Sequence, residues 1–198
     1  MTARLSKPLA ALAAASALLA GCVSFGPEVP EQLIGLTPEM TATAGEMARA
    51  DAGPSFVVLD PDVGQKLDVL RVPVQIDPSS IAYVQDATWV ERPARQFRSL
   101  LAETIRAKTG RLVIEGDDLE VTGDLFVSGR LLDMGYDVGS QSVVVRYDAV
   151  LEGRDGAVRS RRFESRVPGV SATAVSVAPA LNRAANDVAQ QVADWLVS

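Results

Sequence analysis

Histidine is absent from the 198-residue sequence, and cysteine occurs once, as Cys22. The lack of histidine excludes catalytic arrangements of the Ser-His-Asp and Cys-His types. A single cysteine forms no internal disulfide, and without histidine it has no partner for a zinc site. Lysine is scarce as well: beyond the first 21 residues only Lys66 and Lys108 occur, and neither has a serine three positions before it, which argues against a serine–lysine hydrolase. The sequence therefore predicts a protein that is not an enzyme.

Carboxylates gather at one place, but without the spacing of a calcium-binding loop. The cluster consists of Glu115, Asp117, Asp118 and Glu120. We interpret it as a solvated turn between two strands. No metal site and no catalytic residue are therefore predicted.

The single cysteine follows a short apolar run near the start of the chain. Arg4 and Lys7 precede residues 8–20, which are almost entirely Ala and Leu. This run is shorter than the roughly 20 residues that a membrane-spanning helix needs, so it is typical of a signal peptide. It ends in the letters LAGC, where Gly21 and Cys22 resemble the cleavage site of a bacterial lipobox. The alternative is an ordinary secretory signal that happens to contain a cysteine.

The lipobox resemblance implies cleavage between Gly21 and Cys22 and a covalent lipid on the cysteine. The expected modification is a thioether-linked diacylglycerol with a further acyl chain, such as palmitate, on the freed amine, and no other cofactor is predicted. Two or more acyl chains hold a protein stably on a membrane, whereas one does not. Val23 stands where an aspartate is associated with retention in the inner membrane, so we expect the periplasmic face of the outer membrane.

Loss of the signal peptide makes the chain more acidic. Residues 1–21 contain two basic residues and no acidic one, so the mature chain keeps 17 basic and 25 acidic residues, a net charge of −8. Proteins that bind nucleic acid carry a basic surface, so this charge excludes nucleic acid as the expected partner.

The sequence divides into a signal peptide at 1–21, a lipidated cysteine and tether at 22–32, and one folded domain at 33–198. The tether contains Gly and Pro and has no apolar pattern. Its ten residues after the cysteine reach at most about 33–36 Å. Within the domain, residues 32–37 are predicted to form a short strand, and residues 38–54, rich in Ala, Thr, Gly and Pro, a mobile loop.

The domain is predicted to have an α/β fold of the α+β type: a mixed, largely antiparallel sheet packed with two amphipathic helices. Pro93 and the spacing of apolar residues predict a helix at 93–108 that ends at Gly110. Pro73 is expected at a sheet edge or a bulge, and Asp155-Gly156 at a hairpin turn. Strands are predicted at 56–60, 67–76, 121–131, 142–151 and 157–167, two short extended pieces at 81–90, and a second helix from Ser176.

Each helix is predicted to have one face in the core. On the first, Phe97, Leu101 and Ile105 recur every fourth residue, which leaves Arg98 on the outer face. On the second, the predicted core stripe is Leu181, Ala184, Val188, Val192 and Trp195. Its predicted polar face is Asn182, Arg183, Asn186, Asp187, Gln190, Gln191 and Asp194.

Arginines gather at two places. One group, Arg92, Arg95 and Arg98, begins the first helix, and the other, Arg159, Arg161, Arg162 and Arg166, lies in the last strand. Guanidinium groups bind phosphates and carboxylates, so an acidic partner or a lipid head group is one interpretation. The other is ion pairing across the surface with Glu91, Glu103, Asp148 and Glu164.

The segment IAYVQDATWVERPARQFRSLLAETI, residues 81–105, resembles the ABC-type transport auxiliary lipoproteins, the PqiC-like group. The matching residues are Tyr83, Trp89, Pro93, Leu100 and Leu101, and the lipobox and the helix closing on Trp195 also fit. The chain departs from the family at VPVQI, where relatives carry a Leu-Pro-x-Tyr-Leu stretch.

This resemblance implies an outer-membrane lipoprotein of a lipid-transport system, whose partners are an MCE-domain tunnel protein and ABC transporter components. The candidate partner interface is Tyr83, Trp89, Arg92, Arg159, Arg161 and Arg162. For Trp89 the alternative is a core residue that covers the first helix. The alternative function is a structural lipoprotein that links the outer membrane to the cell wall, and a homo-oligomer is left open.

Overall fold

The computed structural model describes residues 33–45, 53–116 and 123–198. The predicted signal peptide, Cys22 and the tether lie outside the described residues, as do Asp117, Asp118 and Glu120 of the carboxylate cluster. These described residues belong to one folded unit.

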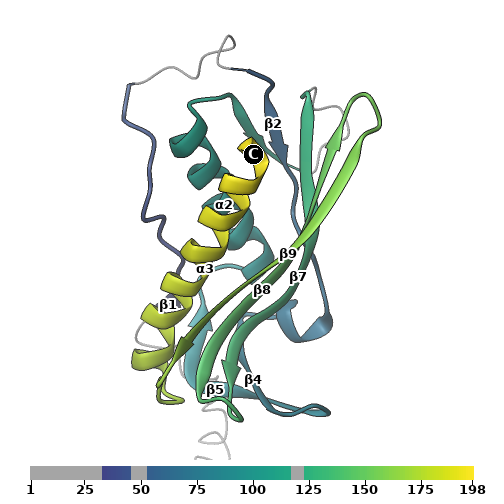
Figure 1. The fold of residues 1–198 in the computed structure, drawn as a ribbon. Helices are drawn as coiled ribbons and strands as arrows, with labels where there is room; N and C mark the ends of the chain where they lie inside the picture. The colour runs from purple at the N-terminus through teal and green to yellow at the C-terminus, as the bar shows by residue number, and fades with distance from the viewer. Residues whose placement is uncertain (1–32, 46–52, 117–122) are drawn as a thin grey trace, which may run out of the picture. The chain divides into compact units, whose positions relative to one another are not determined.

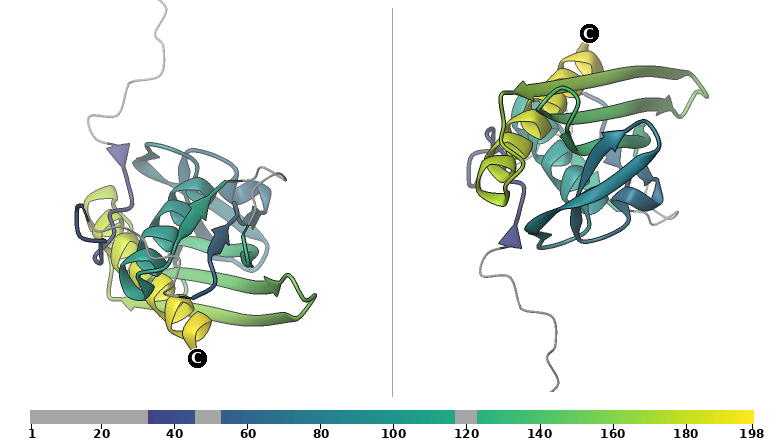
Figure 2. Two further views of the ribbon diagram at one scale, coloured as in Figure 1. Left: turned by 90° about the horizontal axis from the view of Figure 1, so that it is seen from above. Right: turned by 90° about the horizontal axis from the view of Figure 1, so that it is seen from below.

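The described residues form a nine-stranded mixed sheet with two long helices against one face (Figures 1 and 2). The helices are α2 (Pro93–Thr109) and α3 (Ala174–Val197), and a 3-10 turn, η2, spans Gln65–Leu67. The strands are β1 (Leu33–Ile34), β2 (Phe56–Val58), β3 (Asp62–Val63), β4 (Arg71–Asp77), β5 (Ser80–Trp89), β6 (Val113–Glu115), β7 (Leu125–Asp137), β8 (Ser142–Gly153) and β9 (Val158–Pro168). The α+β prediction is confirmed.

The long strands pair antiparallel, and the short ones join them in parallel. The pairs β4–β5, β7–β8 and β8–β9 are antiparallel. The two-residue β1 lies parallel to β5, while β2, β3 and β4 each lie parallel to β7. Among the described strands β9 pairs only with β8, so it forms one end of the sheet.

A proline at the start and a glycine at the end set the limits of helix α2. Pro93 occupies the first turn, where a missing N–H costs no hydrogen bond. Gly110 follows the last turn with φ 64°, a left-handed conformation that glycine adopts without strain, and its N–H donates to Arg106. Phe97 and Ile105 are fully buried, which confirms the predicted core face.

The strand β8 shows why the sheet forms. Its alternate residues Val143, Val145, Tyr147, Ala149 and Leu151 are all buried on the face that the helices cover, as predicted. The ring of Phe97 on α2 packs on Tyr147, with ring centroids 5.1 Å apart. Burial raises the pKa of Tyr147. Gly156, with φ 79°, closes the predicted β8–β9 hairpin, and its N–H donates to Gly153.

One prediction about the strands is wrong, and another is confirmed. Residues 81–90 are not two pieces about a turn, because β5 is one strand through Trp89. The strand departs from extended geometry at Asp86, which adopts a left-handed φ of 56°. Pro73 lies where the β4–β5 register shifts, which confirms the predicted bulge.

Helix α3 buries a wider face than the sequence predicts. All five predicted core residues are buried, and so are Ala185, Ala189 and Ala193. Asn186 was predicted on the polar face, yet it is 1% exposed. No helix among the residues that the structure describes is both long and apolar enough to cross a membrane.

The segment after β1 is held by side chains of both helices. Backbone N–H groups of Leu36 and Ala42 donate to Gln96 (2.9 Å) and Glu103 (2.8 Å) on α2. Those of Thr37 and Glu39 donate to Asn182 and Asn186 on α3, each at 2.8 Å. The prediction of a mobile loop is therefore wrong for residues 38–42, while residues 46–52 lie outside the described part of the chain.

Candidate functional site

Trp89, the candidate interface anchor, lies in the core. It is 1% exposed and its backbone N–H donates to Leu70 at 2.9 Å. Within the described residues its indole Nε1 is buried without a hydrogen-bond partner. A side chain in this position does not reach a partner at the surface, so the interface interpretation is wrong for Trp89, and the core alternative holds.

Tyr83 and Arg92 lie far across the sheet from the arginines of β9. Tyr83 is half-buried next to buried Val84, so its ring points to the face opposite the helices, where Arg71 lies 4.3 Å above it. Arg92 is exposed, with its Nη1 3.3 Å from Asp68. Strands β4, β7 and β8 separate β5 from β9. The six candidate residues therefore do not form a single surface.

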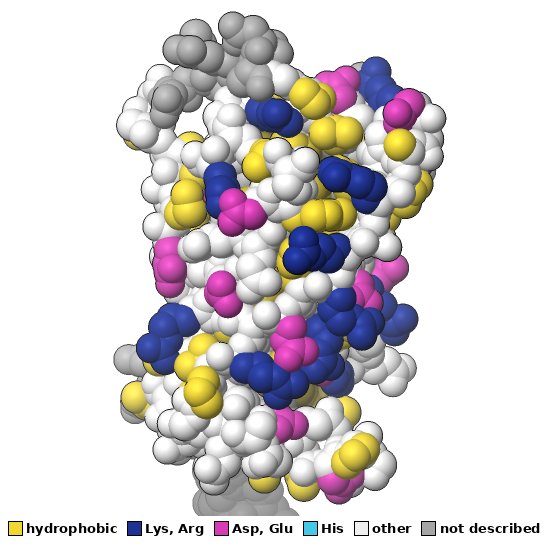
Figure 3. Space-filling model, in the orientation of Figure 1, with side chains coloured by type: hydrophobic (Ala, Val, Ile, Leu, Met, Phe, Trp, Pro, Cys, Tyr) yellow, Lys and Arg dark blue, Asp and Glu magenta, His cyan; other side chains and the backbone are white. Residues whose placement is uncertain are grey.

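Basic side chains occur in two settings on the face shown in Figure 3: beside acidic side chains, and between hydrophobic ones. Arg162 belongs to the first setting, because it makes a two-pronged hydrogen bond to Asp148 at 2.6 and 2.7 Å. This contact lowers the pKa of Asp148 and raises the pKa of Arg162. Because Asp148 neutralises the guanidinium of Arg162, this arginine is a weak binding site for an acidic partner.

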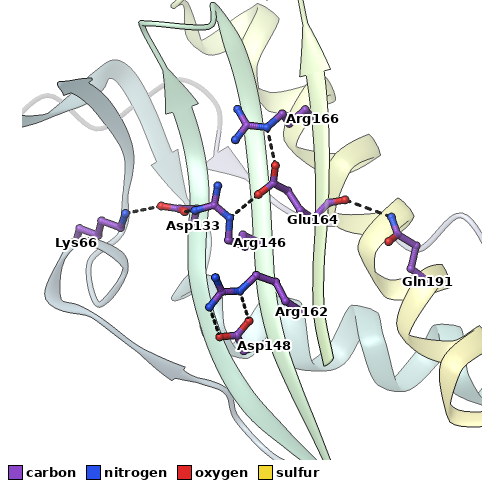
Figure 4. Close-up of polar contacts among 8 residues, drawn as sticks. All are labelled: Lys66, Asp133, Arg146, Asp148, Arg162, Glu164, Arg166 and Gln191. Carbon is purple, nitrogen blue, oxygen red and sulfur yellow. Dashed lines mark hydrogen bonds and ion pairs between the residues drawn. The ribbon is translucent and has the colours of Figure 1, made fainter. Parts of the chain in front are cut away.

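Ion pairs link strands β7, β8 and β9 on the face away from the helices (Figure 4). Asp133 accepts from Lys66 at 2.5 Å and from Arg146 at 2.6 Å. Glu164 accepts from Arg146 at 2.5 Å and from Arg166 at 2.6 Å. Burial raises the pKa of Glu164, but the hydrogen bonds from these two arginines outweigh burial and lower it. The five charges form a continuous chain of alternating sign.

A cavity of about 300 Å³ opens beside this chain of ion pairs. Its charged lining includes Lys66, Asp133, Arg146 and Arg166, each of which already has a partner of opposite charge. Binding a charged ligand here would require breaking existing pairs, so the cavity is a weak candidate for recognition.

Arg159 and Arg161 belong to the second setting. The guanidinium of Arg159 lies 5.3 Å from the ring centroid of Trp195, and that of Arg161 lies 5.3 Å from Phe163. The two rings are themselves 5.7 Å apart. We call these four residues the arginine–aromatic cluster. Cation–π contacts of this kind contribute about 0.5–1 kcal/mol at exposed sites and leave the guanidinium donors open.

The arginine–aromatic cluster differs from Arg146, Arg162 and Arg166 in its charge balance. In the described part of the chain, no carboxylate lies within ion-pair distance of Arg159 or Arg161. Beside Arg161, a hollow of about 290 Å³ is lined by two aromatic residues, Phe163 and Trp195, and by the polar or charged residues Gln191, Asp194 and Ser198. A surface with two cations that lack an ion-pair partner suits an acidic ligand.

The ion-pair interpretation holds for the arginines at the start of α2. Arg95 lies 3.2 Å from Glu91 and is exposed. Arg98 is only 16% exposed and lies 2.8 Å from Asp60 on the loop after β2. The prediction that Arg98 stands on the outer face is therefore wrong. Its side chain points inward and connects α2 to the loop after β2.

No group of three or more potential metal ligands occurs within residues 33–45, 53–116 and 123–198. The described member of the carboxylate cluster, Glu115, lies 3.7 Å from Arg98 and 3.5 Å from Arg106. Glu115 therefore forms ion pairs with two arginines of α2.

Two solved structures with TM-scores above 0.6 share this fold. A protein of Xanthomonas campestris, described as a DUF330 protein, is 17% identical and has a TM-score of 0.69, with 83% of this chain and 94% of that chain covered. An uncharacterized protein is 11% identical with a TM-score of 0.63, covering 83% and 99%. The PelC dodecamer from Paraburkholderia phytofirmans is 15% identical with a TM-score of 0.43, covering 77% and 90%. Among curated proteins none matches the chain.

The sequence itself matches one family model, over residues 36–193. This range begins just after β1 and ends in the last turns of α3, so it includes both helices and the long strands. The family is described as the ABC-type transport auxiliary lipoprotein component, in agreement with the resemblance of residues 81–105. The chain belongs to the ABC-type transport auxiliary lipoprotein family.

Proposed function

We propose that the protein is a non-enzymatic lipoprotein, anchored at the periplasmic face of the outer membrane through Cys22, that serves an MCE-type lipid-transport system by binding a periplasm-spanning partner. The match to the auxiliary lipoprotein family over residues 36–193 carries this proposal. The lipobox-like sequence at Cys22 supports the anchor.

The charges of the domain support binding rather than chemistry. Six charged side chains of β7, β8 and β9 pair with one another, namely Asp133, Arg146, Asp148, Arg162, Glu164 and Arg166. A binding domain held near its membrane by a lipid and a short tether meets a partner at a raised effective concentration. The lipid anchor and the binding surface of the domain would therefore both favour association with the partner.

Co-purification tests the function. The tagged, full-length lipoprotein is expressed with the MCE-domain protein and ABC components of its own genome and is isolated in detergent. We expect the MCE-domain protein to co-purify with it. Recovery of the lipoprotein without any transporter component, together with peptidoglycan fragments, would contradict the proposal and support the cell-wall alternative.

Fractionation tests the anchor separately. The Cys22→Ser variant should remain as an uncleaved or unlipidated precursor and should be missing from the outer membrane. Mass spectrometry of the wild-type protein should find the acyl chains on Cys22. Normal outer-membrane recovery of the variant would show that the lipid is not the anchor.

A further inference from the structure

The end strand β9 has a backbone edge that points away from the sheet. The N–H of Gly153 donates to Ala157 at 2.9 Å, which sets the alternation of hydrogen bonds in the β8–β9 hairpin. By this alternation the backbone groups of Ser160, Arg162 and Glu164 face away from β8. The carbonyl of Glu164 accordingly accepts a hydrogen bond from Gln191 on α3, at 3.4 Å (Figure 4).

Only the first half of this edge is uncovered. Residues 158–162 are all exposed, with Val158 at 60%. From Phe163 onward the strand alternates between buried and partly exposed positions, and α3 lies against it. The backbone groups of Ser160 and Arg162 therefore form a short open edge, to which another strand can add.

The side chains along the open edge carry a charge opposite to that of the chain. The whole sequence has a net charge of −6, but residues 158–162 contain three arginines and no acidic residue. Asp148 compensates Arg162, whereas Arg159 and Arg161 lie over the aromatic rings of Trp195 and Phe163. Charged residues commonly protect an edge from aggregation, but uncompensated arginines of one sign attract an acidic strand.

We propose that the open edge of β9 binds an extended, acidic segment of a partner protein, which adds a strand to the sheet and places two carboxylates on Arg159 and Arg161. This inference rests on the proposed function and assigns the surface at which the periplasmic partner docks. Alternate residues of an added strand share one face, so the acidic residues are two positions apart.

The place of the hairpin in the fold favours a protein over a lipid of the anchoring membrane. β1, where the described domain begins, and the turn of the β8–β9 hairpin lie at opposite sides of the folded unit (Figures 1 and 2). Within the folded unit (Figures 1 and 2), the hairpin is therefore remote from Leu33, the end through which the proposed tether continues to the membrane. A partner that spans the periplasm reaches that side.

Peptide binding tests the surface directly. The probe is a fluorescein-labelled peptide of alternating Glu and Val, and fluorescence anisotropy measures its binding to the full-length lipoprotein in detergent micelles. We expect the double variant Arg159→Gln/Arg161→Gln to bind about tenfold more weakly or worse, because it loses two charge-assisted hydrogen bonds. The matched control, Arg95→Gln/Arg183→Gln, removes two exposed arginines outside the candidate interface and should bind like the wild type. A peptide of alternating Lys and Val should not bind.

A backbone variant separates strand addition from simple charge attraction. Ser160→Pro removes an N–H that points outward, so the β8–β9 hydrogen bonds stay intact while the open edge is blocked. We expect it to abolish peptide binding without lowering the melting temperature by more than a few degrees. If Ser160→Pro fails to fold, the arginine variant still decides the outcome.

Four results would overturn the inference. The first is equal peptide affinity of the wild type and the Arg159→Gln/Arg161→Gln variant. The second is loss of self-association in that variant, measured by light scattering, with peptide binding unchanged, which would assign the edge to a second copy. The third is dependence of binding to phosphatidylglycerol vesicles, rather than to peptide, on the two arginines. Co-purification of the MCE-domain protein with the double variant at wild-type yield would refute this surface and leave the proposed function standing.

Discussion

Asn186 on α3 donates a hydrogen bond from Nδ2 to the backbone carbonyl of Thr37, 3.0 Å away and 149 positions earlier in the chain. Its Oδ1 accepts from the N–H of Glu39 at 2.8 Å. One buried amide therefore satisfies two backbone groups of a segment that has no strand partner there. A buried polar side chain is stable only when its groups are paired in this way.

Asn186→Ala should destabilise the domain by about 1–3 kcal/mol, because it leaves these backbone groups unpaired. Denaturant unfolding measures the loss, and hydrogen exchange should show faster exchange of the Glu39 amide. Arg183→Ala, on the exposed face of the same helix, is the control and should change stability by less than about 0.5 kcal/mol. Equal effects of the two substitutions would contradict the role of Asn186.

Leu101→Ala should cost about 2–5 kcal/mol, because Leu101 is buried between α2 and the sheet and the change leaves a cavity. Urea unfolding of the protein checks this value. Ser99→Ala, at an exposed position two residues earlier, serves as the control. A similar midpoint for both variants would mean that the core face of α2 is misplaced.

Arg98→Ala should cost about 1–2 kcal/mol, because its half-buried contact with Asp60 is lost. Arg95→Ala removes an exposed pair with Glu91 and should stay within about 0.5 kcal/mol. Thermal melts of the two variants, run in parallel at the same pH, compare them. A change of less than about 0.5 kcal/mol for Arg98→Ala would show that its ion pair is as weak as a surface pair.

Trp89→Ala should cost about 3–5 kcal/mol, because a large buried ring is removed. Partner binding should fall only in proportion to the unfolded fraction. The test combines a melt with pull-down of the MCE-domain protein at a low temperature, where the variant remains folded. Loss of binding by a fully folded variant would restore Trp89 as an interface residue.

Acid should weaken the domain through Asp148. Hydrogen bonds from Arg162 hold the pKa of Asp148 below its ordinary value, so the unfolded chain takes up the proton more readily than the fold. The stabilisation is therefore present above about pH 4 and is lost as the pH falls through the lowered pKa. Asp148→Asn should be less stable than the wild type at pH 7, and the difference should shrink between about pH 5 and pH 3. Arg162→Gln should flatten the acid slope in the same way, and an unchanged slope in both variants would contradict this assignment.

Hydrophobic periodicity was sufficient to predict the elements that are long and amphipathic. The recurrence of Phe97, Leu101 and Ile105, and the alternation from Val143 to Leu151, reflect one buried face in each case. The short strands behave differently. β1 has two residues, and its parallel pairing with β5 depends on contacts more than 50 positions away, which no local pattern encodes.

Long-range partners also explain the errors at the candidate site. Asn186 follows two buried alanines on the helix, but its partner, the loop at residues 37–39, is invisible to a periodicity argument. The arginines look alike in the sequence, and only the register of β8 and β9 decides that Arg162 meets Asp148 while Arg161 lies opposite Ala149. Trp89 was ambiguous for the same reason, because burial is decided by the whole fold.

The attachment of residues 33–42 gives the domain a mechanical property. A force applied at Leu33 is resisted first by the two-residue pairing of β1 with β5 and then by separate hydrogen bonds to Gln96, Asn182, Asn186 and Glu103. These contacts are few and separate, whereas strands β7, β8 and β9 pair along most of their length. Released and fully extended, ten residues add at most about 33–36 Å of length. In the proposed function, release of this segment would lengthen the link between the membrane and the folded core without unfolding that core.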